Sequence, residues 1–297
     1  MRVTSAFTFV WILAAPLVGA QVGSGVEPRI LPADPAVSAT HPPDWLPELV
    51  PDAPGTAPGA PPSGHGTSAP GTAGSGAGRD FYRLVLTPLP ADQRTIWTAP
   101  FHLNRRNACF WVPAAVGSAA LVLADQRLYR DTTGRLSLTA RNNMGKFSRL
   151  GNPGYMFGVS GGLWLWGNSG SRRPLRQTAL LASRALIDDM LVVGVLKVAL
   201  GRERPPGGSF GGPPDGVRSG DYRSLPSGHA SAAWTMASVI SSRHRQRWVP
   251  FVLYGFAGAV SITRVTSGRH FYGDVVPGAL IGYSIGKMVV RRSQANP

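Results

Sequence analysis

The sequence has one cysteine, Cys109, among 297 residues. A single thiol cannot form an internal disulfide, nor can it provide half of a cysteine-based metal site. Acidic residues are also few, 15 Asp and Glu against 30 Lys and Arg, so the formal net charge is +15 at pH 7. No cluster of Asp, Glu and His suggests a two-metal site, so no metal or other cofactor is expected. This balance favours partners that carry phosphate: nucleic acid, anionic lipid or small phosphate esters.

Signatures of nucleic-acid recognition are missing as well. The sequence contains no zinc finger, helix-turn-helix pattern or aromatic RNA-binding motif. We therefore expect a phosphate-ester substrate, with a membrane lipid as one option, and no nucleic-acid partner.

Residues 21–80 lack any sustained apolar periodicity and consist mainly of Pro, Gly, Ala and Ser. Such a segment buries too little apolar surface to offset the entropy of ordering it, so it is predicted to be a disordered leader. The remainder, residues 81–297, has long apolar stretches and most of the positive charge. It is predicted to fold as one domain.

Residues 1–20 have the pattern of a secretory signal peptide. Arg2 supplies a positive charge, an apolar run follows, and the small residues Val18-Gly19-Ala20 precede Gln21. An uncleaved membrane anchor is the alternative, but the apolar run is short for a span of about 20 residues. The protein is therefore expected to be exported and extracytoplasmic, either periplasmic or in the cytoplasmic membrane with its site facing the periplasm.

A two-residue alternation typical of strands is not sustained anywhere, and the fold class is predicted to be all-α, a single bundle of about six helices. Clusters of Gly, Pro, Asn and Arg separate the predicted helices, including the segment 141–154. The predicted helices run over Cys109–Tyr129, Pro153–Trp166, Leu175–Leu200, His229–Arg243, Val249–Arg264 and Phe271–Arg291.

Two environments remain open for this bundle. The stretches 108–124, 152–171 and 248–263 lack charged residues and are near the lower length limit for crossing a membrane. The third predicted helix, however, carries several charges, including Arg184 and Asp188, which are costly in lipid unless they face a protein interior. Membrane association is therefore possible but is not decided by these patterns.

The first chemical motif is Lys197-x6-Arg204-Pro205. Seven positions span almost two helical turns, so both cations can emerge on the same side. Gly201 is suited to end the helix and Pro205 prevents it from resuming. Cations near a helix C-terminus are also common for a simpler reason, because they complement the helix dipole.

The second motif, Pro226-Ser227-Gly228-His229, precedes a predicted helix. Unpaired backbone N–H groups at a helix start form an anion site, to which Ser227 can add a hydroxyl donor. Gly228 allows a phosphate oxygen to approach the backbone, and His229 is available as a proton donor. The alternative is an ordinary serine-capped helix with an incidental histidine.

The third motif runs from Thr263-Arg264 to His270 and Asp274. His270 and Asp274 are i and i+4, so their side chains can touch. A carboxylate on one ring nitrogen fixes the tautomer and leaves the other nitrogen nucleophilic, while Arg264 offers a planar fork to phosphate oxygens. A purely structural His–Asp contact is the competing interpretation.

Together and in this order, the motifs resemble the signature of the type 2 phosphatidic acid phosphatase family: Lys-x6-Arg-Pro, Pro-Ser-Gly-His and Ser-Arg-x5-His-x3-Asp. One position differs, since Thr263 stands where the family usually has Ser, and it keeps the hydroxyl. The resemblance is strong from about Leu175 to Arg291, and it identifies residues 81–297 as a catalytic domain of this type.

The resemblance implies a metal-independent phosphatase that forms a phosphohistidine. His270 would be the nucleophile, Asp274 would orient it, and His229 would be the general acid and then the general base. The phosphoryl oxygens would be held by Lys197, Arg204, Ser227, Gly228 and Arg264.

Two other functions use the same residues. Vanadium-dependent haloperoxidases have similar motifs and bind vanadate through the matching histidine, although they are usually much longer chains. A non-catalytic protein that binds phosphate or lipid headgroups is the third option, but binding alone needs only the cations. The sequence does not choose among phosphatidate-like lipids, polyprenyl diphosphates and soluble phosphomonoesters.

Overall fold

The computed structural model describes residues 78–102, 104–170, 172–212, 220–244 and 246–295. The expected signal peptide (1–20) and, apart from residues 78–80, the expected leader (21–80) lie outside these ranges.

Helices account for almost all of the described residues and no strand occurs among them, which confirms the all-α class. Two short elements precede the bundle: a π-helix at Tyr82–Leu86 and a 3₁₀ turn at Ala99–His102, with α3 (Leu89–Thr98) between them. The other α-helices are α4 (Arg105–Thr133), α5 (Leu138–Ser148), α6 (Pro153–Ser169), α7 (Arg173–Leu200), α9 (Gly228–Arg243), α10 (Trp248–Thr266) and α11 (Tyr272–Ala295).

All six predicted helices are present, as α4, α6, α7, α9, α10 and α11. The helix α5 corrects the prediction that residues 141–154 only separate two helices. Asn142, Asn143 and Gly145 are weak helix formers, so the sequence did not indicate a helix here. Ser137 caps the helix by accepting a hydrogen bond from the Ala140 N–H at 3.2 Å.

Helix α9 lies at the centre of the bundle and packs against α7, α10 and α11. The closest approach is to α11, which turns Gly278, Gly282 and Gly286 toward α9 at intervals of four residues. A Cβ at Gly282 would collide with the Ser231 carbonyl, so only glycine allows this spacing. The main core is continuous with this contact and includes Leu186, Val192, Met236, Ile285 and Met288.

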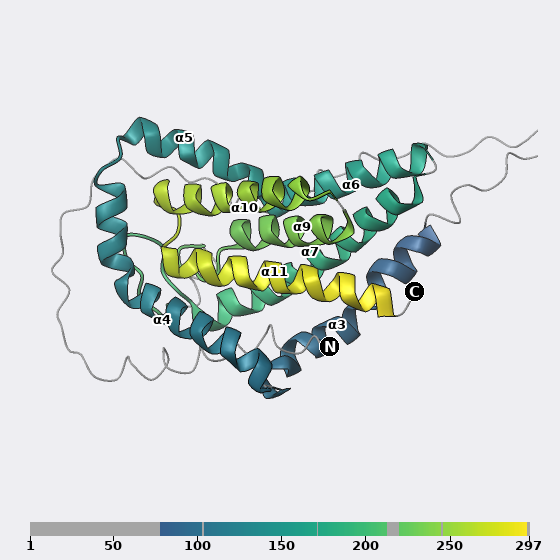
Figure 1. Ribbon diagram of the computed structural model, residues 1–297. Coiled ribbons are helices and arrows are strands. Elements are labelled where there is room, and N and C mark those ends of the chain that lie inside the picture. The colour runs from purple at the N-terminus through teal and green to yellow at the C-terminus, as the bar shows by residue number, and fades with distance from the viewer. Residues whose placement is uncertain (1–77, 103, 171, 213–219, 245, 296–297) are drawn as a thin grey trace, which may run out of the picture.

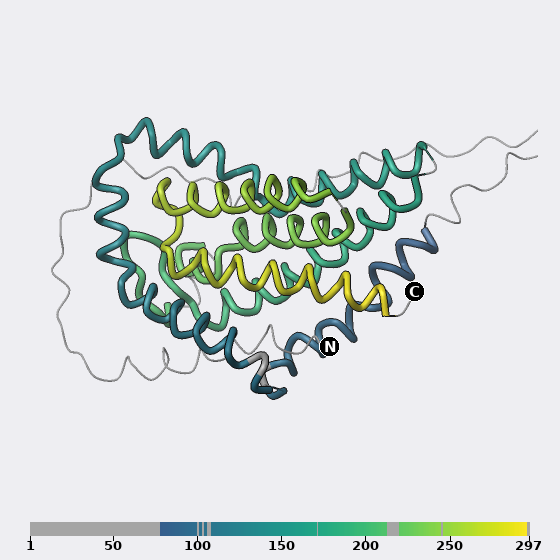
Figure 2. Tube along the Cα trace, in the orientation of Figure 1, coloured from purple at the N-terminus to yellow at the C-terminus, as the bar shows by residue number. Residues whose placement is uncertain are grey.

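One end of the bundle is covered by two helices that cross it. In Figure 1, α7, α9, α10 and α11 lie side by side, while α4 runs steeply across their left-hand end and α5 returns from there to α10. The chain trace in Figure 2 shows that α10 and α11 are joined by a short turn at this same end. The starts of α9 and α11 and the ends of α7 and α10 therefore meet beneath α4 and α5.

Two described helices are long and apolar enough to cross a membrane, Ala108–Thr133 and Trp248–Thr266. Only 28% and 33% of their apolar windows are buried in the bundle. Their outward faces carry large exposed apolar side chains, among them Phe110, Val116, Leu123, Trp248, Phe251, Val252 and Ile262. Length and composition are weak evidence by themselves, but outward apolar faces fit contact with lipid better than the buried core of a soluble protein.

Candidate active site

The three sequence motifs meet at the covered end of the bundle. Lys197 lies in the last turn of α7, His229 in the first turn of α9, Arg264 in the last turn of α10, and Asp274 in the first turn of α11. The site is therefore built from four helix termini, each brought there by the packing around α9.

The first motif ends α7 as the sequence predicts. Gly201 adopts a left-handed conformation with φ +50° and donates its N–H to the Lys197 carbonyl at 3.1 Å. Lys197 directs its ammonium to the Arg223 carbonyl. Burial first, and then the nearby charge of Arg204, lower the pKa of Lys197 to about 7.

The second motif does not form an ordinary serine cap. Ser227 is the N-cap residue of α9, yet its side chain accepts no capping hydrogen bond, and its buried hydroxyl has no protein partner among the described residues. The Ser227 N–H instead donates to the Asp274 carbonyl at 3.0 Å. Gly228 lies beside Lys197, since a Cβ on it would be 3.9 Å from the lysine Cε. The orphaned hydroxyl is consistent with a site for an anion.

The third motif brings the histidine and its carboxylate together. His270 Nδ1 is 3.5 Å from Asp274 Oδ2, and both side chains are buried. Ser224 lies between them: its hydroxyl donates to Asp274 Oδ2 at 2.5 Å and is 3.4 Å from His270 Nδ1. Because Nδ1 faces this polar pair, Nε2 is the ring nitrogen left for chemistry.

Arg264 is held over the site from α10. Its Nη1 donates to the Ser148 hydroxyl at 3.3 Å, which connects the end of α5 to the site. Its own carbonyl accepts the N–H of His270 at 3.2 Å and the N–H of Arg269 at 3.1 Å. The turn between α10 and α11 therefore fixes Arg264 and His270 relative to each other.

Both histidines are neutral at ordinary pH in this environment. Burial, followed by the charge of Arg264, lowers the pKa of His229 to about 2. Burial also lowers the pKa of His270 to about 3, because it outweighs the opposing effect of Asp274. The cations that depress both values form a cage of positive charge that a phosphate would neutralise.

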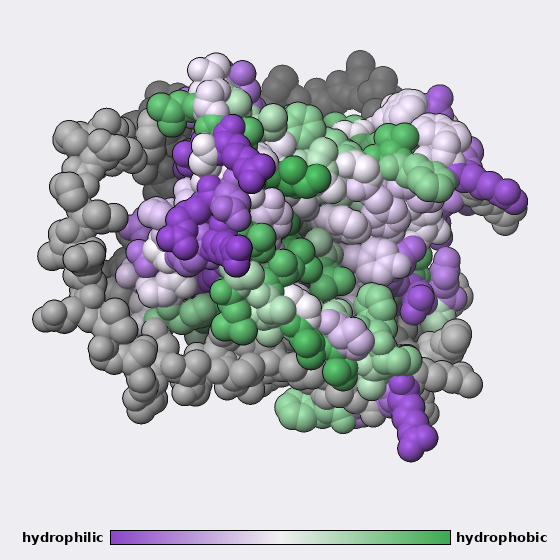
Figure 3. Space-filling view, turned by 60° about the vertical axis from the view of Figure 1, so that its left-hand side comes forward, coloured by the Kyte–Doolittle hydropathy of each residue, from purple (hydrophilic) through white to green (hydrophobic). Residues whose placement is uncertain are grey.

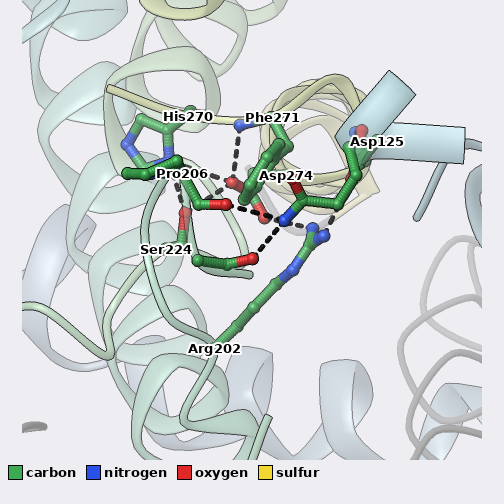
Figure 4. Close-up of polar contacts among 10 residues, drawn as sticks. Asp125, Arg202, Pro206, Ser224, His270, Phe271 and Asp274 are labelled. Atoms are coloured by element: carbon green, nitrogen blue, oxygen red, sulfur yellow. Dashed lines mark hydrogen bonds and ion pairs between the residues drawn. The ribbon is translucent and has the colours of Figure 1, made fainter. Parts of the chain in front are cut away.

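Three residues of this site were not identified from the sequence: Arg202, Ser224 and Asp125. Arg202 Nη1 donates to Asp274 Oδ1 at 2.7 Å, and its Nη2 donates to Asp125 Oδ2 at 2.9 Å. In Figure 4, Asp274 lies between His270 and Ser224 on one side and Arg202 and Asp125 on the other. The sequence offers little indication of these residues beyond nearness to a motif: Arg202 is two positions before Arg204, and Ser224 is three positions before Ser227.

Metal-ligating side chains do not gather in the part of the chain that the structure describes. Within it, no group of three or more His, Cys, Asp or Glu side chains could hold a metal ion. The positive charge opposite His270 comes instead from lysine and arginine side chains.

Comparison with known families finds a match over the C-terminal part of the chain. Residues 178–297 match the model of the PAP2 superfamily. The lipid A 1-phosphatase of Porphyromonas gingivalis is 30% identical over 106 residues, which cover 35% of this chain and 21% of that protein. The matched segment thus spans about a fifth of the relative's length.

Two solved structures match part of this chain. LpxE of Aquifex aeolicus is 22% identical, with a TM-score of 0.44 over 56% of this chain and 94% of its own. The first transmembrane PAP2 type phosphatidylglycerolphosphate phosphatase from Bacillus subtilis is 19% identical, with a TM-score of 0.48 over 63% and 96%.

Proposed function

Because residues 178–297 match the model of the PAP2 superfamily, we propose that this protein is a PAP2-type phosphatase that hydrolyses a lipid phosphate monoester, without a metal ion, through a phosphohistidine. The observation that supports this most is the His270–Asp274 pair facing a cage of cations. A protein that only binds phosphate has no need of a nucleophile held by a carboxylate.

In the first half-reaction, Nε2 of His270 attacks phosphorus and the bond to the leaving oxygen breaks. Asp274 and Ser224 hold the Nδ1 proton of the ring, which becomes positively charged as the P–N bond forms. His229, protonated once the phosphate dianion is bound, gives its proton to the leaving alkoxide. The products are the alcohol and phosphorylated His270.

In the second half-reaction, neutral His229 takes a proton from water, whose oxygen attacks phosphorus. The P–N bond breaks, inorganic phosphate leaves, and His270 returns to its neutral form. Lys197, Arg204 and Arg264 hold the phosphoryl oxygens in both steps, together with the Ser227 hydroxyl and the Gly228 amide. Such a fixed cage stabilises the charge of the transition state, a role that metal ions perform in other phosphoryl-transfer enzymes.

A lipid substrate is supported by the surface around the site. Hydrophilic side chains gather on the end of the molecule that comes forward in Figure 3, near apolar patches. The basic side chains on α4, α5 and the segments that follow them are Arg127, Arg130, Arg135, Lys146 and Arg149, which are exposed, and Arg141, which is half-buried. An anionic headgroup can meet these cations while acyl chains lie along the apolar faces of α4 and α10.

In this proposal the protein is exported and bound to the cytoplasmic membrane through α4 and α10, with the covered end facing the periplasm. The named activity of the Porphyromonas gingivalis relative, a lipid A 1-phosphatase, is of the same reaction type. A lipid substrate presented at the membrane surface would reach the site from the side of the exposed apolar helices.

The test is phosphate release by the full-length protein in detergent micelles containing a lipid phosphate monoester such as phosphatidic acid. We expect turnover that survives EDTA and is inhibited by vanadate, which mimics the five-coordinate transition state. Loss of turnover on chelation, with recovery on addition of a divalent ion, would contradict the proposal. Bromide oxidation in the presence of vanadate and peroxide, without phosphatase activity, would favour the haloperoxidase alternative.

A further inference from the structure

The carboxylate of Asp274 has two sides with different partners. Its Oδ2 faces the histidine: it accepts from the Ser224 hydroxyl and from the Phe271 N–H, the latter at 2.9 Å, and lies 3.5 Å from His270 Nδ1. Its Oδ1 faces away and accepts from Arg202 at 2.7 Å. Figure 4 shows Arg202 on the far side of Asp274 from the imidazole. The Arg202 guanidinium therefore acts on the imidazole through Asp274, and the Arg202 carbonyl also accepts the N–H of Ser224 at 2.9 Å.

Arg202 is enclosed by protein rather than directed at the phosphate cage. Its side chain is 2% exposed, and its guanidinium carbon lies 4.7 Å from the Phe271 ring centre and 5.1 Å from that of Phe210. A buried charge is tolerated only where it is paired. Both of its terminal nitrogens pair with carboxylates, which separates its role from that of Arg204 two residues later.

Asp125 of α4 completes the arrangement. Its Oδ2 accepts from Arg202 at 2.9 Å, and its Oδ1 accepts the N–H of Gly273 at 2.9 Å. Gly273 has no side chain at the point where α4 approaches, and a Cβ there would collide with Asp125 and Val122. The first turn of α11, which carries Asp274, is thereby tied to α4.

The charges in this arrangement suit a cationic intermediate. With both carboxyl groups ionised, Asp125, Arg202 and Asp274 together carry one net negative charge, buried beside His270. A phosphorylated imidazole that keeps its Nδ1 proton is positively charged and is stabilised by that net charge. Lys197 also interacts electrostatically with Asp274.

We propose that Arg202 and Asp125 are positioning residues: Arg202 holds Asp274 ionised and oriented toward His270, and Asp125 fixes both Arg202 and the first turn of α11. This inference rests on the proposed phosphohistidine chemistry. Asp125 lies outside residues 178–297, so the machinery extends beyond the segment that matches the family. A chain reduced to the matched segment would lack this support.

The test compares the pH profiles of kcat/KM for the full-length wild-type protein and Arg202→Gln. Removing an adjacent positive charge raises a carboxyl pKa, so the acid limb should move upward by about 1 to 3 pH units. We expect kcat to fall by about 10- to 100-fold, as for other supporting side chains, with KM nearly unchanged. Arg202→Lys keeps the charge and should leave the acid limb near its wild-type position while kcat still falls. If Arg202→Gln does not fold, the fall in kcat of Arg202→Lys still tests the role of Arg202.

Asp125→Asn should behave differently, because it leaves Arg202 with Asp274 as its carboxylate partner. The site becomes more positive, so kcat should fall by about tenfold at constant KM, with no upward movement of the acid limb. Similar upward shifts in both variants would show that Asp125 does not act as proposed.

Arg184→Gln is a matched control, since it breaks the buried ion pair of Arg184 with Asp92, 2.6 Å long, near the middle of α7 and away from the motif residues. It should lower thermal stability but leave kcat and the pH profile unchanged. An acid-limb shift in this control, or none in a folded Arg202→Gln protein, would overturn the inference.

A readout without substrate separates this inference from the proposed function. Carboxyl ¹³C NMR of Asp274, assigned with Asp274→Asn, reports its ionisation directly, and Arg202→Gln should raise the midpoint. If the wild-type protein releases no phosphate but this midpoint still moves, the proposed function fails and the role of Arg202 stands. If phosphate is released but the midpoint does not move, the role of Arg202 fails alone.

Discussion

His229 lies at the start of α9 and His270 in the turn before α11, and of the two only His270 has a carboxylate beside it among the described residues. His229→Ala should therefore slow turnover of alkyl phosphates by about 10² to 10⁴, the usual worth of a general acid. The loss should be much smaller for p-nitrophenyl phosphate, whose leaving group needs no proton. His244→Ala, at the opposite end of α9 and exposed, is the control and should be fully active. Equal losses of turnover on both substrates would show that His229 is not the general acid.

Lys197 gives a second prediction at the scale of single residues. Its pKa is lowered to about 7 by burial and by Arg204, so at about pH 8 most molecules of the free protein carry a neutral amine. A bound dianion favours the ammonium form, so binding should take up a proton, and affinity should fall as the pH rises above the free-protein pKa. Tungstate is a suitable dianion because it does not titrate near this pH.

Calorimetry of tungstate binding in two buffers with different ionisation enthalpies measures this proton. The observed enthalpy should depend on the buffer for the wild-type protein, and much less so for Lys197→Met. A wild-type enthalpy that is the same in both buffers would show that Lys197 is already charged.

At the scale of elements, the site depends on how closely α9 and α11 approach. Gly282→Ala would drive a Cβ into the Ser231 carbonyl and force the two helices apart, at a cost of about 1 to 3 kcal/mol in the free energy of unfolding. Activity should fall as well, because His229 and Asp274 lie on the separated helices. Chemical denaturation measures the loss in the free energy of unfolding. Gly258→Ala, on α10 with open space around it, should be neutral or stabilising, and a similar loss there would refute the explanation.

The sequence predicted those helices that have long apolar or small-residue runs, and it missed α3 and α5. Asn142, Asn143 and Gly145 do not favour a helix by themselves, and α5 forms where it can pack against α10. Residues whose chemistry is carried by local spacing, such as His270 with Asp274, were found. The contacts of Arg202 with Asp274 and Asp125 span 72 and 77 positions, so no local pattern shows them.

At the scale of the whole molecule, the boundary near residue 80 remains a prediction from composition. No candidate site residue precedes it, and Asp80 itself pairs with Arg176 of α7 at 3.0 Å. A chain that begins near residue 78, exported through a substitute signal peptide, should keep the full kcat/KM for a soluble phosphate ester. The activity of the shortened protein on lipid vesicles is measured in parallel and compared with that of the full-length protein. A shortened protein that folds, as judged by circular dichroism, but is inactive on the soluble ester would show that the leader contributes to the site.

The central claim is that phosphate is transferred to His270, and trapping the intermediate tests it most directly. The full-length protein would be mixed with ³²P-labelled substrate, quenched with alkali within milliseconds to seconds, digested and analysed by mass spectrometry. The account predicts a phosphoenzyme that is stable in base, labile in acid and located on His270. It should be absent in His270→Ala and retained in His244→Ala. A phosphoenzyme of the same kind in His270→Ala, or turnover by that variant at the wild-type rate, would contradict the account.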